Sequence, residues 1–106
     1  MELHTFSSLT EEFLRQYAHA MDEADTAMVY YSPAAVAHKK LPPIHPEAIF
    51  NAFQRRDLHV YNESEKMKND LVSMDWRDSV LLLMSSGNFD GINLNKFGEK
   101  IISLQA

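Results

Sequence analysis

The sequence predicts an α/β domain with a small, mainly parallel sheet and helices on both faces. The first observation is that short apolar segments alternate with segments of helical periodicity along the chain. Strands that alternate with helices are joined by right-handed crossovers, which make the sheet parallel. The second observation is that Val80–Met84 is apolar at every position, as in a strand buried on both faces.

The composition indicates one globular domain over residues 1–106, with 45% hydrophobic and 24% charged residues. The net charge of −5 disfavours a protein that binds the nucleic-acid backbone, which needs a basic face. The absence of cysteine removes disulfides, thiolate catalysis and cysteine-based zinc sites. With no apolar run near the roughly 20 residues of a spanning helix and no leader pattern, we expect a cytoplasmic protein without membrane contact.

The first helix is expected over Ser8–Met21. Ser8 and Glu11 fit the S-x-x-E capping box, in which each side chain accepts a hydrogen bond from a main-chain amide. The apolar residues recur at three- and four-residue steps and so share one face: Leu9, Phe13, Tyr17, Ala20 and Met21. Met1–Thr5 resembles the end of a strand, which suggests a piece of a larger α/β domain.

A buried strand is expected at Ala27–Tyr31, which is short, apolar and followed by Ser-Pro. The proline-rich loop after it has room for one helical turn at Ala34–His38. Pro46 fits the first position of the next helix. The apolar side of that helix is Ile49, Phe50 and Phe53. A second strand is expected at Leu58–Tyr61.

The carboxy-terminal part is expected to contain a helix, a strand and a helix. Asn62 or Ser64 can cap the third helix, whose inward residues are Met67, Leu71 and Met74. Trp76 lies in the turn before the third expected strand, Val80–Met84. The last helix is expected to begin near Phe89 to Ile92 and to bury Leu94, Phe97, Ile101, Ile102 and Leu104.

Three segments follow the expected strands, and ligands of parallel sheets bind at such carboxyl ends. They are Ser32–Lys40, Asn62–Glu65 and Ser85–Gly91. The third offers hydroxyls, a side-chain amide and open main-chain N–H groups beside an expected helix N-terminus, which suits a carboxylate or a phosphate. It lacks the patterns G-x-x-x-x-G-K-[ST], G-x-G-x-x-G and G-x-S-x-G.

Other candidate residues give weaker signals. Lys39 and Lys40 could hold an anion, although an exposed lysine pair is also typical of plain surface charge. The five histidines are scattered without metal-ligand spacing, so no metal site is predicted. The residues by themselves indicate an α/β module that binds an anion or a substrate and has no catalytic residues of its own.

Three segments together resemble a known family. They are HTFSSL (His4–Leu9), ADTAMVYYSPAAVAHKKLPPI (Ala24–Ile44) and LLLMSSGNFDGI (Leu81–Ile92). They are similar to the carboxy-terminal domain of the Mur ligases, closest to the murein peptide ligase branch, and SSGNFDGI is the most specific element. The middle segment, Glu47–Arg77, adds little to the resemblance beyond its general sequence pattern. Ser8 stands where related muramate–alanine ligases have arginine, so the role of that arginine is not carried over.

The resemblance implies a three-layer, Rossmann-like domain that lacks the first strand–helix portion of the family's third domain. In the complete enzyme, ATP and Mg²⁺ are bound mainly by a central domain. A muramyl carboxylate becomes an acyl phosphate, an amine attacks it, and an amide forms. In this branch the reaction joins a recycled murein tripeptide, L-Ala-γ-D-Glu-meso-diaminopimelate, to UDP-N-acetylmuramate in peptidoglycan recycling. The chain by itself is expected to be inactive and to bind no cofactor.

The resemblance also implies a role for each site residue. Those that line the carboxylates of the peptide are Ser85, Ser86, Gly87, Asn88 and Phe89, with Lys39 and Lys40 as secondary candidates. His4 and Thr5 would lie near the interdomain, ATP-proximal face. One alternative is a stand-alone module that binds an anionic peptide or a nucleotide. A second alternative is a structural or dimerisation domain, because a truncated sheet exposes an edge.

Overall fold

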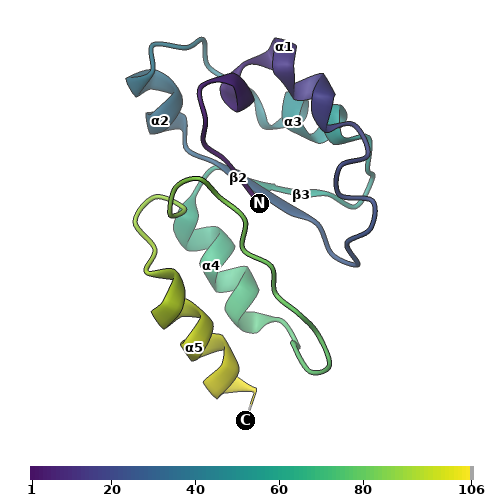
Figure 1. Ribbon diagram of the computed structural model, residues 1–106, viewed down its shortest axis with the longest axis vertical. Coiled ribbons are helices and arrows are strands. Elements are labelled where there is room, and N and C mark those ends of the chain that lie inside the picture. The colour runs from purple at the N-terminus through teal and green to yellow at the C-terminus, as the bar shows by residue number, and fades with distance from the viewer. Residues whose placement is uncertain (106) are drawn as a thin grey trace.

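The computed structural model describes residues 1–105, and its centre is a three-stranded parallel sheet (Figure 1). The strands are β1 (Glu2–Leu3), β2 (Met28–Tyr31) and β3 (His59–Tyr61), in the spatial order β1-β2-β3. Tyr30 of β2 lies opposite Glu2 on one side and Tyr61 on the other. The small α/β domain with a parallel sheet is therefore confirmed.

Helices cover both faces of this sheet. The helical elements are η1 (Ser7–Leu9), α1 (Glu11–Leu14), η2 (Arg15–Tyr17), α2 (Pro33–His38), α3 (Pro46–Phe53), α4 (Ser64–Ser73) and α5 (Leu94–Leu104). Figure 1 shows α1 and α3 on one side of the strands and α4 with α5 on the other. Among the described residues, no helix is long and apolar enough to cross a membrane.

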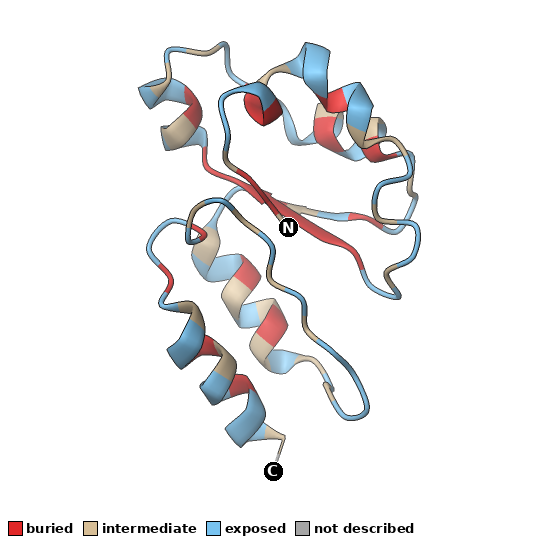
Figure 2. Cartoon of the chain, in the orientation of Figure 1, coloured by how far each residue is buried: buried red, intermediate tan, exposed pale blue. Residues whose placement is uncertain are grey.

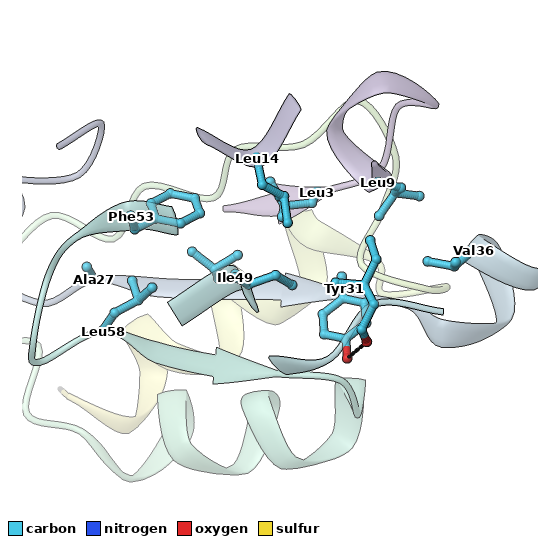
Figure 3. Packing of buried hydrophobic residues seen from close by; sticks show 11 residues of the cluster. Leu3, Leu9, Leu14, Ala27, Tyr31, Val36, Ile49, Phe53 and Leu58 are labelled. Carbon is cyan, nitrogen blue, oxygen red and sulfur yellow. Dashed lines mark hydrogen bonds between the residues drawn. The ribbon is translucent and has the colours of Figure 1, made fainter. Parts of the chain in front are cut away.

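The central strand β2 supplies side chains to two separate cores, because successive residues of a strand point to opposite faces. All four of its residues are buried (Figure 2). Val29 and Tyr31 belong to the cluster beneath α1 and α3, together with Leu9, Leu14, Ile49 and Phe53 (Figure 3). Met28 and Tyr30 belong to the cluster beneath α4 and α5, together with Met67, Leu71, Phe89, Phe97 and Ile101.

Local signals in the middle of the chain predicted the structure well. The Ser32 hydroxyl accepts a hydrogen bond from Ala35 N (3.1 Å) and caps α2, whose first residue is Pro33. Pro46 likewise begins α3 as predicted. Both β2 and β3 form within the predicted segments. Glu63 is the N-cap residue of α4, so neither candidate named for that position occupies it.

The long helix expected over Ser8–Met21 is wrong. The chain forms η1, α1 and η2 instead, and helical geometry ends at Ala18, whose ψ is 124°. The capping box does not form, because Ser8 is buried and its hydroxyl donates to the carbonyl oxygen of Thr5 (2.9 Å). Thr10 is the N-cap residue of α1, without a side-chain cap. A local turn between Thr5 and Ser8 therefore uses the hydroxyl that the spacing assigned to a helix cap.

The strand expected at Val80–Met84 is also wrong, and β1 supplies the third strand in its place. Along the described chain, the only main-chain hydrogen bond that reaches this segment runs from Glu2 N to Met84 O (2.9 Å). Val80 and Leu82 are 88% and 65% exposed. Apolar composition alone does not make a strand, because a strand also needs repeated main-chain hydrogen bonds to a neighbouring strand.

The last helix begins later than predicted, at Leu94. The Asn93 side chain caps it by accepting a hydrogen bond from Lys96 N (3.1 Å). Phe97 and Ile101 are buried as expected, whereas Ile102 and Leu104 are exposed. The apolar face of α5 is thus only partly covered. Phe13 and Phe50, expected on inward faces, are also exposed.

Candidate functional site

The segment Ser85–Gly91, here called the SSGNF loop, lies at the carboxyl ends of the strands. The Ser64 hydroxyl donates to Phe89 O (2.9 Å), and α4, which begins at Ser64, follows β3 directly. The Phe89 side chain is fully buried, with its ring centre 6.1 Å from that of Tyr30 in β2. The loop therefore occupies the edge where ligands of parallel sheets bind.

A buried carboxylate organises the loop from within. Glu2 of β1 is only 6% exposed. Its Oε1 accepts hydrogen bonds from the Ser85 hydroxyl and from the main-chain N–H of Phe89 (2.9 Å). A buried charge is costly unless it is paired and hydrogen-bonded. These two donors therefore stabilise the buried carboxylate of Glu2. Two groups that were expected to receive a ligand carboxylate are thus occupied by a carboxylate of the chain itself.

His4 completes this arrangement. Its Nδ1 lies 3.7 Å from Glu2 Oε2. Its ring also packs so closely on Gly87 that a Cβ added to the glycine would lie 3.0 Å from the imidazole. Glycine at position 87 therefore permits a close approach of side chain to main chain. The structure brings His4 and the loop together, although more than 80 residues separate them in the sequence.

The last three residues of the loop have left-handed backbone angles. Phe89, Asp90 and Gly91 have φ angles of 54°, 62° and 97°. Non-glycine residues adopt such angles at a cost, which the surrounding contacts must offset. One such contact is the hydrogen bond from Gly91 N to Asn88 Oδ1 (2.9 Å). Asn88 is exposed, and its amide N–H₂ group has no acceptor within residues 1–105.

The charges around the loop are negative. Burial raises the pKa of Tyr30, and the nearby charges of Asp90 and Glu2 raise it further. Burial also lowers the pKa of the Met1 amino group to about 6, an effect that the charge of Glu2 opposes. In the described chain, no lysine or arginine side chain is paired with Glu2. Binding of an anion here would depend on N–H and hydroxyl donors and on His4.

The Met1 amino group gives a pH prediction. Its pKa is about 6 in the folded protein and 8.0 without burial, so the unfolded chain binds the proton more tightly. Stability is therefore expected to rise by about 2 kcal/mol between pH 6 and pH 8. Urea unfolding at both pH values measures this rise. Acetylation of the amino group should remove it, and the same rise in the acetylated protein would contradict the assignment.

The other predicted residues lie apart from this network. Lys39 and Lys40 follow α2, whose six residues, about 9 Å of helix, separate them from the end of β2. Their side chains have no ion pair or hydrogen bond with any described residue. The Thr5 hydroxyl donates to Ser8 Oγ (3.0 Å) and so belongs to the turn after β1. These three residues are therefore not joined to the loop.

We expected the N-terminus of the last helix to lie beside the loop, but it lies farther along the chain. Because α5 begins at Leu94, its free N–H groups lie beyond Gly91, and Asn93 already caps them. The dipole of α5 is therefore not expected to stabilise an anion bound at Ser85–Asn88. The donors that remain unassigned are Ser86 and the amide of Asn88, both exposed.

Sequence reasoning missed two members of the network, Glu2 and Ser64. Glu2 stands in a segment that resembled only the end of a strand, and nothing in its local sequence marks a buried carboxylate. Ser64 was considered as a helix cap, but its hydroxyl donates to Phe89 O. Only the contact between distant segments reveals either role.

Searches for other kinds of site and for similar proteins gave no positive finding. Within residues 1–105, no cluster of three or more His, Asp or Glu side chains is arranged to hold a metal ion. No family model, no curated protein and no solved structure matches the chain.

Proposed function

We propose that this chain is the substrate-positioning domain of an ATP-dependent amide-forming ligase of the Mur type. In this proposal the fold is a truncated, three-layer, Rossmann-like carboxy-terminal domain. The complete enzyme would join a murein tripeptide to UDP-N-acetylmuramate, with ATP and Mg²⁺ bound by another domain. Ser86 and Asn88 would contact the carboxylates of the peptide, and the chain alone would not catalyse the reaction.

One observation carries this proposal. Two segments of the resemblance, His4–Leu9 and Leu81–Ile92, meet at the carboxyl edge of the parallel sheet through Glu2, His4 and Gly87. Ligands of open α/β sheets bind at this edge. A rigid loop that holds hydroxyl and amide donors is suited to carboxylates, which accept such hydrogen bonds.

The geometry divides the loop residues into two groups. Ser85 and the Phe89 N–H hold Glu2 and shape the loop, so they would not bind substrate. Ser86 and Asn88 are exposed, and His4 is partly exposed beside them. The substrate contacts would therefore come from Ser86, Asn88 and His4. Lys39 and Lys40 would contribute only if another domain or the bound peptide approached them.

The test is an NMR titration of the chain with L-Ala-γ-D-Glu-meso-diaminopimelate, with ATP as the comparison ligand. We expect the peptide to shift the amide signals of Ser86–Asn88, and ATP to leave them unchanged. Shifts caused by ATP alone would favour the alternative, a stand-alone module that binds nucleotides. No shift with either ligand would count against a binding role for the loop in this chain.

The variant Asn88→Asp tests the carboxylate contact directly. It keeps the Oδ1 acceptor for Gly91 N, and so keeps the turn, but it replaces the amide donor with a negative charge. Repulsion of the carboxylates is expected to raise the peptide Kd about tenfold, which corresponds to about 1.4 kcal/mol. The control is Asn69→Asp, an exposed position of α4 that should leave the Kd unchanged. Equal affinities for both variants would contradict the proposed contact.

A further inference from the structure

A slot lies between β2 and the segment Val80–Met84, below the amino end of β1. This segment meets β1 at Met84, whose carbonyl oxygen accepts a hydrogen bond from Glu2 N (2.9 Å). The space between this segment and β2 belongs to an open cavity of about 740 Å³. Its lining includes Met1, Thr26 and Met28 on one side and Leu81, Leu83 and Met84 on the other.

The walls of the slot have main-chain groups in position for a strand. In the described chain, the N–H groups of Val80–Met84 have no hydrogen-bond acceptor. The bond from Glu2 N to Met84 O (2.9 Å) is the first rung between this segment and β1. On the opposite wall, the Met1 amino group donates to Met28 O (2.8 Å), and Tyr30 N donates to Met1 O (2.9 Å). The pairing of β1 with β2 therefore reaches the mouth of the slot.

Most side chains that line the cavity are apolar, and its acidic residues are Asp25, Asp75 and Asp78. Segment 80–84 has no charged residue, and Leu81 and Leu83 are half-buried while Val80 and Leu82 are exposed. Met67 and Leu71 of α4 line the same cavity beneath the sheet. A strand in the slot would be covered on both faces, so its own residues would have to be apolar.

We propose that the slot receives one extended, apolar β-strand, joined to the amino end of β1 and parallel to β2. Such a strand would pair with β2 on one side and with Val80–Met84 on the other. Segment 80–84 would then become the fourth strand of a sheet in the order (80–84)-β1-β2-β3. Such a strand would give acceptors to the N–H groups of Leu82 and Met84 and would fill the cavity. The inference does not depend on the ligand of the SSGNF loop.

The test adds five residues to the amino end of the chain in three versions. The first extension is Val-Ile-Val-Ala-Val, which can pair and fill the slot. The second is Gly-Ser-Gly-Ser-Gly, which has N–H groups but little apolar surface. The third is Val-Pro-Val-Pro-Val, which is apolar but lacks two of the N–H donors that a ladder needs.

Only the first extension is expected to protect the amides of Leu82 and Met84 from hydrogen exchange, by about tenfold or more, because alternate residues of this segment face β1, as Met84 does. It should also raise the Tm by about 4 °C or more relative to the Gly-Ser version. Equal exchange rates and equal Tm values in all three versions would overturn the proposal. So would concentration-dependent dimerisation of the original chain with protection of the Leu82 and Met84 amides, because a second copy would then be the occupant.

Discussion

Replacing Phe89 by alanine is expected to lower the free energy of unfolding by about 3 to 5 kcal/mol. Phe89 has no exposed surface, and its side chain packs with Tyr30 in the core beneath α4 and α5. Its removal would leave a cavity at the point where the SSGNF loop is anchored. Alanine would also retain the left-handed φ of 54°, so no relief of backbone strain offsets the loss.

Urea unfolding, followed by circular dichroism, measures this change. The slope of the unfolding free energy against urea concentration (the m-value) should be the same in both proteins. The matched control is Phe50→Ala, because Phe50 is 38% exposed on α3 and its truncation leaves a smaller cavity. The control should cost about 1 kcal/mol or less. A loss for Phe89→Ala no larger than that of the control would show that the loop is not anchored by this side chain.

Replacing Glu2 by alanine is expected to cost about 2 to 4 kcal/mol. The Phe89 N–H and the Ser85 hydroxyl would lose their acceptor at a site that water reaches poorly. Glu2→Gln keeps an acceptor oxygen without the charge, so it should recover part of the loss. The exposed Glu12→Ala is the control, and its effect should be within about 0.5 kcal/mol.

The same variant gives a structural readout. The main-chain signals of Ser85–Phe89 should shift and broaden in Glu2→Ala, because the loop loses its inner support. In Glu12→Ala they should stay in place. If Glu2→Ala left both the stability and the loop signals unchanged, the carboxylate would have no part in shaping the loop.

Local chemistry explains the elements that the sequence predicted correctly. Pro33 and Pro46 begin helices because their fixed φ suits the first helical position and their missing N–H would have no partner there. The β2 segment is apolar on both faces, and both faces are covered. In each case the deciding interaction lies within a few residues or follows from burial alone.

The errors arise where other hydrogen bonds compete with the expected local pattern. Ser8 fits a cap by spacing, but its hydroxyl donates to the carbonyl oxygen of Thr5, three residues earlier, in a turn. Val80–Met84 has the composition of a central strand, but it has only one main-chain bond to a neighbour. The position of the candidate loop was predicted, whereas its support by Glu2 was not, because that contact spans 87 positions in sequence.

The sequence by itself determined the alternation of strands and helices, the parallel sheet and the location of a donor-rich loop after an apolar segment. These follow from periodicity, proline and glycine, which act on the chain locally. Only the tertiary structure decided which loop donors are already occupied, which apolar segment is paired, and that a buried carboxylate holds the site. Hydrogen bonds between distant segments decide these points, because a buried donor or acceptor must find a partner wherever the fold places one.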